Sequence, residues 1–175
     1  MKYSGGGEEM PAEVRVRGFE PGDEDVLAEM IASFRVELCR LRDEGCEPNL
    51  EAAREELSEF RAKGYPIYVA EAGGKPVGYL VLRVEDDVVW AEQLYVKPGF
   101  RRRGIGSSLY AVAEEHCERL GGDTVYNWVH PNNHAIIAFL KKRGYTVLNL
   151  IEIRRPWPGE RPRRKVRVGP YEFDY

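Results

Sequence analysis

The sequence predicts a mixed α+β fold in which one sheet carries helices on both faces. Two observations support this class. The spacing of apolar residues changes from three and four near the N-terminus to two in the middle of the chain, and then returns to the helical spacing. Clusters of Gly, Pro, Asn and Asp separate these segments and give the element order βααβββαβαββ. A meander followed by a crossover connection in this order is typical of a mixed sheet.

Length and composition indicate one soluble globular domain. The chain has 175 residues, of which 43% are hydrophobic and 31% charged, and its net charge of -3 argues against a general nucleic-acid coat. No apolar run is long enough to span a membrane. Residues 1–12 lack the apolar core of a signal peptide, so we expect a flexible tail followed by a single domain over residues 13–175. The three cysteines lack CxxC spacing and are expected to be reduced thiols in the cytoplasm.

The first 65 residues predict one strand and two helices. Residues 13–17 alternate and form the strand. An amphipathic helix follows from Val26, with Asp23 as its N-cap. A second helix covers residues 50–63, and Asn49 is its N-cap.

The middle of the chain predicts an antiparallel meander. Two strands, residues 67–72 and 75–84, flank the turn at Gly73 and Gly74, and a third strand covers residues 88–96.

Helices and strands alternate in the last part of the chain. A helix over residues 105–120 connects the meander to a strand over 124–129, which is reached by a crossover and is therefore expected to run parallel to residues 88–96. A helix over residues 134–143 and strands over 145–153 and 165–173 complete the prediction.

The junction between the third meander strand and the following helix predicts an anion-binding site. Residues 96–110 contain three consecutive arginines, 101–103, followed by Gly104 and Gly106. A strand that turns through small residues into a helix leaves backbone N–H groups unpaired, and the positive end of the helix dipole points to the same place. Phosphate is the usual ligand of such a site.

Several interpretations of this junction compete. A P-loop needs Lys followed by Ser or Thr after its last glycine, whereas Ser107 and Ser108 follow Gly106. A dinucleotide-binding fingerprint needs a third glycine where this chain has Leu109. A plain tight turn explains the glycines without a ligand. The remaining interpretation is a pyrophosphate held by an Arg-x-x-Gly-x-Gly loop behind an antiparallel meander.

Two segments of the sequence resemble the GNAT superfamily of acetyl-CoA-dependent N-acetyltransferases. Residues 92–96 together with 101–106 are similar to its acetyl-CoA-binding motif, and residues 133–145 are similar to its next motif, an Asn-initiated helix that ends in Gly-Tyr. The order of elements also agrees over residues 14–153. The resemblance implies a GNAT-like acyl-CoA N-acyltransferase fold, a mostly antiparallel sheet with a splayed parallel strand pair.

The resemblance also implies how acetyl-CoA, the co-substrate, binds. The pantetheine arm lies in the gap between the splayed strands, the backbone of residues 102–107 holds the pyrophosphate, and Asn133 contacts the arm or shapes its channel. The implied cofactor-binding residues are Leu94, Tyr95, Val96, Arg101, Arg102, Arg103, Gly104, Ile105, Gly106, Ser107 and Asn133.

Acetyl transfer to an amine needs a base, because an alkylamine of pKa about 10.4 is only about one part in two thousand neutral at pH 7. Glu92 is the candidate base, since it lies in mid-strand and matches a glutamate of similar polyamine-type enzymes. Strand alternation places its side chain opposite to Gln93 and Tyr95. An ion pair with an arginine across the sheet is the equal alternative for Glu92. A backbone N–H near Leu94 or Tyr95 is the candidate oxyanion donor.

One residue departs from the family pattern. Many members carry a tyrosine that protonates the departing thiolate, and the corresponding position here is Leu140. Tyr126, one strand away, is a candidate substitute, although a tyrosine that lines the core or the channel explains it as well. His130 and His134 lack further ligands at metal-binding spacing, so no metal is expected.

The expected function is transfer of an acetyl group to a primary amine of a small molecule, a lysine or a protein N-terminus, directly in a ternary complex. The alternative is a catalytically inactive acyl-CoA-binding regulatory module. The expected partners are acetyl-CoA and an amine acceptor, neither nucleic acid nor a membrane, with a homodimer as the alternative to a monomer. The acceptor is expected between the first helices and the basic segment 154–164. The acidic helices favour a cationic amine, whereas the basic segment favours an acidic peptide or metabolite. The acidic residues on the helices are Glu37, Asp43, Glu55, Glu56 and Glu59.

Overall fold

The computed structural model describes residues 13–42, 45–162 and 164–175. The described residues form two compact units, which divide between Ile137 and Ala138. The predicted flexible tail, residues 1–12, lies outside the described residues, and the single domain over residues 13–175 stays a prediction.

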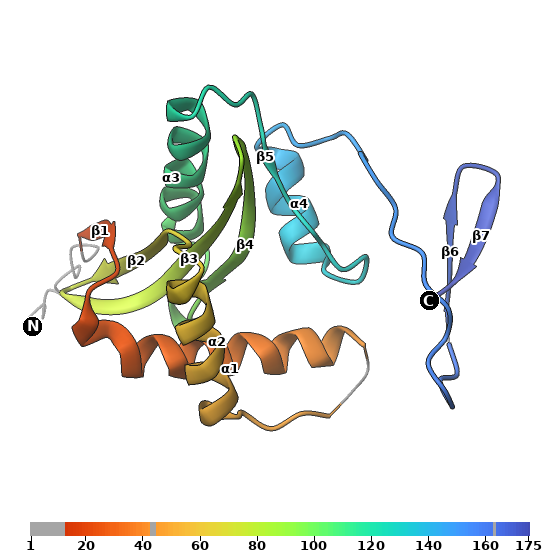
Figure 1. Cartoon of the computed structure of the whole chain (residues 1–175), viewed down its shortest axis with the longest axis horizontal. Helices are drawn as coiled ribbons and strands as arrows, with labels where there is room; N and C mark the ends of the chain where they lie inside the picture. Colours follow the sequence, from red (N-terminus) through yellow and green to blue (C-terminus); the bar gives the residue numbers. More distant parts are fainter. Residues whose placement is uncertain (1–12, 43–44, 163) are drawn as a thin grey trace, which may run out of the picture. The chain divides into compact units, whose positions relative to one another are not determined.

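The first unit contains a five-stranded sheet in the order β1-β2-β3-β4-β5 (Figure 1). Its strands are β1 (Val14–Gly18), β2 (Ile67–Ala72), β3 (Lys75–Glu85), β4 (Val88–Val96) and β5 (Val125–Tyr126). The first four strands pair antiparallel in sequence order, whereas β5 runs parallel to β4. The predicted meander and the predicted parallel crossover are therefore confirmed.

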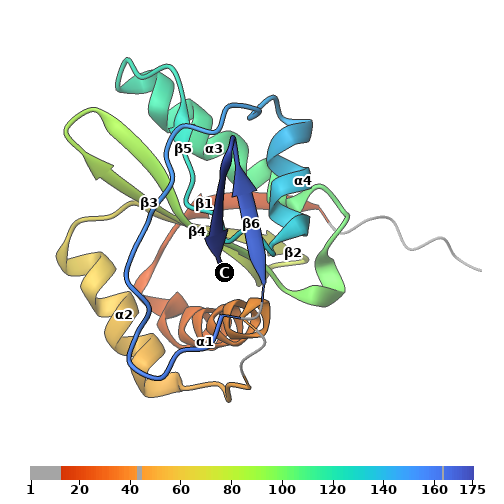
Figure 2. The ribbon, with the colours of Figure 1, turned by 90° about the vertical axis from the view of Figure 1, so that its right-hand side faces the viewer.

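Helices cover both faces of this sheet (Figures 1 and 2). Helices α1 (Glu24–Leu41) and α2 (Leu50–Ala62) pack on one face, and α3 (Ile105–Arg119) packs on the other. The short turns η1 (Pro21–Asp23) and η2 (Pro98–Phe100) precede α1 and follow β4. The core under α1 and α2 is formed by alternate strand residues and one stripe of each helix, as their periodicity predicts. Its larger members are Leu27, Met30, Ile31, Leu57, Phe60, Ile67, Tyr79 and Tyr95.

The two predicted helix caps have different outcomes. The side chain of Asn49 accepts a hydrogen bond from the Ala52 N–H at 3.0 Å, which confirms it as the N-cap of α2. Asp23 occupies the predicted N-cap position of α1, but its side chain makes no capping hydrogen bond to this helix. Its carboxylate instead accepts hydrogen bonds from Arg17 at 2.7 and 2.8 Å and from the Glu20 N–H at 2.8 Å, because a buried carboxylate favours a cationic partner.

The strand β5 is shorter than predicted. Its ladder with β4 contains only the pairs Val89–Val125 and Trp90–Tyr126. The Asn127 amide then donates to the Val125 carbonyl at 3.1 Å and to the Tyr110 hydroxyl at 2.8 Å. The ladder to β4 thus ends at Tyr126, and the residues directly after it belong to no strand.

The second unit differs most from the sequence-based expectation. Helix α4 (His134–Lys142) crosses the boundary between the units, and β6 (Lys165–Val168) and β7 (Tyr171–Asp174) form an antiparallel hairpin. The single strand predicted over 165–173 is thus wrong, because Gly169, with φ +59°, starts a turn at its centre.

The strand predicted over residues 145–153 is also wrong. This segment has no strand pairing within the part of the chain that the structure describes. Its large apolar side chains are exposed, from Ile151 at 44% to Val147 at 87%. An alternating apolar pattern is typical of a strand, but a strand also needs a second strand with which its backbone can pair.

The cysteines also correct the sequence-based expectation. Cys39, on α1, and Cys46 form a disulfide, with their Cα atoms 6.1 Å apart. That separation lies within the usual range for a bridge, although the CxxC spacing is absent. Cys117 is a free, buried thiol, as expected, and burial raises its pKa.

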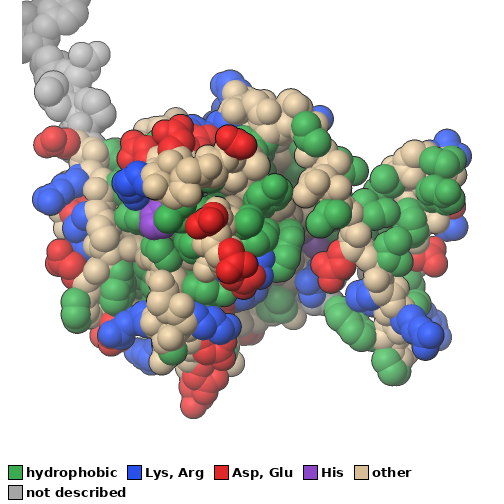
Figure 3. Space-filling model, turned by 45° about the horizontal axis from the view of Figure 1, so that its top comes forward, with side chains coloured by type: hydrophobic (Ala, Val, Ile, Leu, Met, Phe, Trp, Pro, Cys, Tyr) green, Lys and Arg blue, Asp and Glu red, His purple; other side chains and the backbone are tan. Residues whose placement is uncertain are grey.

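The surface of the first unit mixes charges of both signs on the face shown in Figure 3. No helix in the described ranges is both long and apolar enough to cross a membrane.

Candidate active site

The segment between β4 and α3 forms a loop, residues 97–107, that we call the anion loop. After the turn η2, Arg102 and Gly104 both adopt left-handed backbone conformations, with φ +63° and +83°. Within the described chain, the backbone N–H groups from Arg102 to Ser107 donate to no other group. They lie at the N-terminus of α3, which begins at Ile105. The predicted cluster of unpaired donors at a helix N-terminus is therefore present, and its chemistry suits an anion.

The side chains of the three arginines have different surroundings. Arg101 Nε donates to the Val96 carbonyl at 2.7 Å, and Arg101 Nη2 lies 2.6 Å from the Glu37 carboxylate. The guanidinium of Arg103 lies over the Phe100 ring, 5.6 Å from its centroid. Two of the three guanidinium groups thus already have partners of their own.

A β-bulge interrupts β4 at Glu92. Val81 of β3 pairs with Gln93, but Leu82 pairs with Ala91, which leaves Glu92 as the extra residue. Glu92 Oε2 lies 3.6 Å from Nε of Arg83, a residue that strand alternation places on the same face as the core residue Val81. The prediction that Glu92 lies opposite to Gln93 is therefore wrong, because a bulge adds one residue and shifts the alternation.

Arg83 connects Glu92 to an aromatic cluster. Its guanidinium lies 4.3 Å from the ring centroids of both Trp90 and Trp128, and it also approaches Glu85 at 3.5 Å. Within the described residues, Arg83 Nε has no hydrogen-bond partner. The side chain of Glu92 is 27% exposed and so stays accessible. The structure thus contains the ion pair that was the alternative explanation of Glu92.

A buried polar network lies beside the bulge. The Tyr79 hydroxyl donates to Gln93 Oε1 at 2.7 Å, and Gln93 Nε2 donates to Glu56 Oε1 at 2.5 Å. Glu56 also accepts from Arg35 Nε at 2.9 Å. Burial raises the pKa of Tyr79 well above its ordinary value, so this phenol stays a donor. Hydrogen bonding to Glu56, with a smaller contribution from the charge of Glu92, raises the pKa of Arg35.

Sequence reasoning missed most of this network. Glu56 was expected to face the acceptor, but Gln93, Tyr79 and Arg35 were given no role. A polar side chain at a core position of an apolar strand was the available signal, because such a group needs a partner.

The other predicted site residues occupy different environments. Tyr95 is buried, and burial raises the pKa of its phenol, so its backbone is the part available to a ligand. Tyr126 is 37% exposed, with its ring 5.8 Å from that of Trp90. Asn133 accepts a hydrogen bond from the Ile136 N–H at 3.3 Å in the first turn of α4. Its carboxamide therefore has a structural partner.

The acidic acceptor-side residues do not act as one group. Glu56 contacts Gln93 of β4 and Glu37 pairs with Arg101 of the anion loop. Glu59 instead pairs with Lys63 on its own helix at 3.8 Å. Asp43 lies outside the described residues. No cluster of metal-ligating side chains occurs in the ranges that the structure describes.

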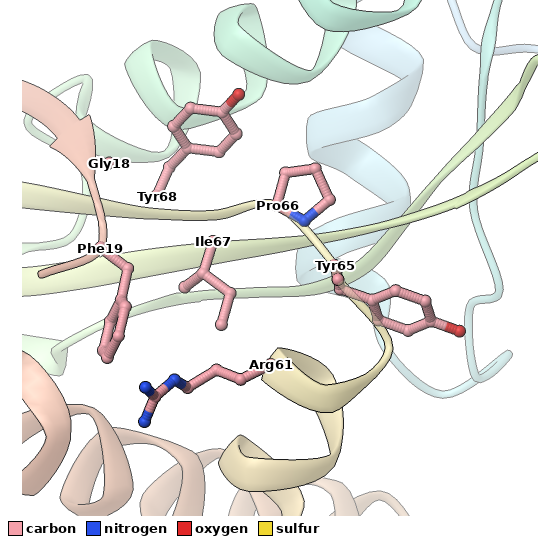
Figure 4. A pocket seen from close by; sticks show the side chains of 8 residues that line it. Gly18, Phe19, Arg61, Tyr65, Pro66, Ile67 and Tyr68 are labelled. Carbon is pink, nitrogen blue, oxygen red and sulfur yellow. The ribbon is translucent and has the colours of Figure 1, made fainter. Parts of the chain in front are cut away.

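A separate shallow hollow lies between the end of α2 and the start of β2 (Figure 4). Its lining includes Phe19, Tyr65, Ile67 and Arg61. Arg61 is paired with Glu24 and lies 5.4 Å from the centroid of the Phe19 ring. No reactive group of the anion loop or of the bulge lines this hollow, so we do not assign the site to it.

The model of the acetyltransferase (GNAT) family matches residues 31–145, about two thirds of the chain. The chain belongs to this family. An uncharacterized N-acetyltransferase of Methanocaldococcus jannaschii is 34% identical over 85 residues, which are 45% of this chain and 38% of that protein. The chain therefore matches well under half the length of this curated relative.

Solved GNAT structures share the fold. The aminoglycoside N-acetyltransferase AAC(6')-Iy in complex with CoA has a TM-score of 0.68 at 15% identity, over 84% of this chain and 97% of that chain. The PaiA N-acetyltransferase of Thermoplasma acidophilum in complex with coenzyme A has a TM-score of 0.63 at 20% identity, over 75% and 88%. These identities show the fold alone. The predicted superfamily and the predicted fold class of this GNAT protein are thus confirmed.

Proposed function

We propose that this GNAT protein transfers an acetyl group from acetyl-CoA to a primary amine, by direct transfer in a ternary complex. The observation that carries the proposal is the continuity of three features on one strand. A carboxylate stands at the bulge of β4, the ladder to β5 ends beside it, and the unpaired N–H groups of the anion loop follow the end of the strand. Two structural neighbours were solved in complex with CoA, which supports the choice of acyl carrier.

Acetyl-CoA would use backbone groups for most of its contacts. Residues 94–96 of β4 would pair with the amides of the pantetheine arm, where the ladder to β5 has ended. The N–H groups from Arg102 to Ser107 would hold the pyrophosphate at the positive end of α3. Asn133 would border the arm while it caps α4. The acyl carrier would then place its thioester beside the bulge.

Glu92 would act as the base for the amine. Its carboxylate takes the ammonium proton, directly or through a water, and the amine nitrogen then attacks the thioester carbonyl carbon. The C–S bond breaks as the amide forms, CoA leaves as a thiolate, and the second proton of the attacking nitrogen passes to that thiolate or to water. A thiol pKa near 8.5 makes this leaving group tolerable without an acid, which fits a leucine at position 140. Tyr126 is the candidate donor to the thiolate.

A thiol-release assay with acetyl-CoA and a panel of small amines, lysine peptides and free N-terminal peptides tests the activity. We expect release of CoA that depends on the amine. CoA binding without turnover on any acceptor would contradict the proposal and would favour the regulatory binding module.

The substitution Glu92→Gln tests the base. We expect kcat/KM to fall about 10²- to 10⁴-fold at neutral pH, and by less at high pH, where more of the amine is already neutral. Glu85→Gln is the matched control, because Glu85 also approaches Arg83 but is more exposed, at 58%. An equal loss at every pH, or an equal loss in both variants, would remove Glu92 as the base.

A further inference from the structure

The side chain of Arg101 points away from the N–H groups of the anion loop. Its Nε donates to the Val96 carbonyl at 2.7 Å, and its Nη2 lies 2.6 Å from Oε1 of Glu37 on α1. The guanidinium also lies 5.4 Å from the centroid of the Tyr95 ring. Its contacts thus involve the last two residues of β4 and one residue of α1. An arginine used for phosphate binding would instead keep its fork free for the anion.

Tyr95 provides a second connection between β4 and α1. Its buried ring packs edge-on against Phe34 of α1, with centroids 6.3 Å apart, and lies 6.1 Å from Tyr79 of β3. Arg101 covers this ring at the surface, where the side chains of Arg101 and Glu37 are 41% and 36% exposed. The end of β4 is therefore held to α1 by the buried contact of Tyr95 with Phe34 and by the ion pair of Arg101 with Glu37 at the surface.

The same helix is also tied to the segment before α4. Asn132 Nδ2 donates to the Leu41 carbonyl at the last residue of α1, at 2.8 Å. Asn132 precedes Asn133, which we place beside the acyl carrier. The C-terminal half of α1 thus contacts both segments that would border acetyl-CoA, and Arg101 makes one of these two contacts.

We infer that Arg101 is a positioning residue and not a phosphate ligand. Its guanidinium holds the Val96 carbonyl and the start of the anion loop against Glu37, so that the strand edge and the loop keep the spacing that the carrier needs. The inference rests on the proposed function only in naming acetyl-CoA as that carrier.

A pair of ligands separates positioning from phosphate binding. Both CoA and pantetheine, which has the arm but no phosphate, are titrated into the wild-type protein and into Arg101→Met. If Arg101 positions the strand edge and the start of the loop, the variant lowers the affinity for pantetheine about tenfold and the affinity for CoA by at least as much. A loss for CoA alone would show a phosphate contact, and no loss for either would show no role. Both results would overturn the inference.

Three further variants sharpen the test. Arg101→Lys keeps the positive charge but not the planar guanidinium with its several donors. We therefore expect this variant to show most of the loss of affinity seen in Arg101→Met. Full recovery of CoA binding by lysine would contradict the inference. Glu37→Gln should also lower the affinities for both CoA and pantetheine. The double variant with Arg101→Met should lose little more affinity than Arg101→Met alone, because the two side chains form one contact. Arg119→Met is the control, because this exposed arginine lies at the other end of α3, and it should leave the binding of both ligands unchanged.

A measurement without ligand tests the inference even if the proposed function fails. The Lys97 N–H donates to the Val77 carbonyl at 2.8 Å and the Phe100 N–H donates to the Lys97 carbonyl at 2.9 Å, so both amides report the start of the loop. We expect their hydrogen exchange to accelerate in Arg101→Met and to stay unchanged in Arg119→Met. Equal exchange in the two variants would overturn the positioning role. Absence of CoA binding by the wild type would overturn only the proposed function.

Discussion

Replacing Gly104 with alanine should strain the anion loop without any steric clash. Gly104 has φ +83°, and a Cβ built on it would meet no atom within 4 Å. The cost therefore comes from the backbone alone, and a left-handed L-residue costs about 1–2 kcal/mol. Gly99→Ala is the matched control, since its Cβ would also meet no atom within 4 Å and its φ is not in the left-handed range.

The difference between the two variants isolates the conformational cost, because both replace glycine with alanine in the same loop and change the unfolded chain alike. We expect Gly104→Ala to be less stable than Gly99→Ala by about 1–2 kcal/mol, which lowers Tm by about 2–8 °C for a domain of this size. If the loop relieves this strain by leaving its conformation, the N–H groups from Arg102 to Ser107 no longer converge. The affinity for CoA should then fall about tenfold.

Thermal unfolding followed by circular dichroism and calorimetric titration with CoA measure the two quantities. Gly99→Ala should keep the wild-type affinity. If both variants unfold at the same temperature and bind CoA equally well, the left-handed conformation of Gly104 does not shape the site, and the reasoning fails.

Three further predictions concern stability in urea. Replacing Cys39 and Cys46 by serine should lower the free energy of unfolding by about 2–3 kcal/mol, since the bridge closes a loop of sequence separation 7. A reductant should destabilise the wild type by the same amount and leave the stability of the variant unchanged. The hydrogen bonds from Arg17 lower the pKa of Asp23, so its contribution is present above the unfolded value near 3.9 and is lost as pH falls below it. Asp23→Asn should therefore cost about 3 kcal/mol at pH 7 and reduce the loss of stability in acid, and an unchanged acid profile would contradict this. Asn49→Ala should cost about 1 kcal/mol through the lost cap of α2, and an unchanged stability would show that the cap is dispensable.

The elements of the first unit could be read from the sequence because their determinants are local. Apolar spacing predicts α1, α2, α3 and the meander, and Asn49 lies beside the N–H group that it caps. The anion loop is equally local, since unpaired donors and a left-handed glycine depend on a few consecutive residues. These features, with the Asn-initiated helix, were sufficient to indicate the family.

The orientation of Glu92 and the residues around it depended on the tertiary structure. The bulge exists only because β4 pairs with β3, and one extra residue turns Glu92 toward Arg83. The contact of Gln93 with Glu56 joins residues 37 positions apart, from a strand and a helix. Neither periodicity nor a motif encodes such a distance, because each describes neighbours along one element.

Local signals in the sequence specify the elements of the first unit and the anion loop, whereas the contacts among the side chains at the bulge depend on long-range packing. The exposed segment 145–153 marks the same limit, since its alternation fits a strand and no neighbouring edge pairs with it in the described chain. Local conformation follows from φ and ψ preferences and from apolar spacing. Pairing requires a second segment at the correct distance, and this depends on how the whole chain packs.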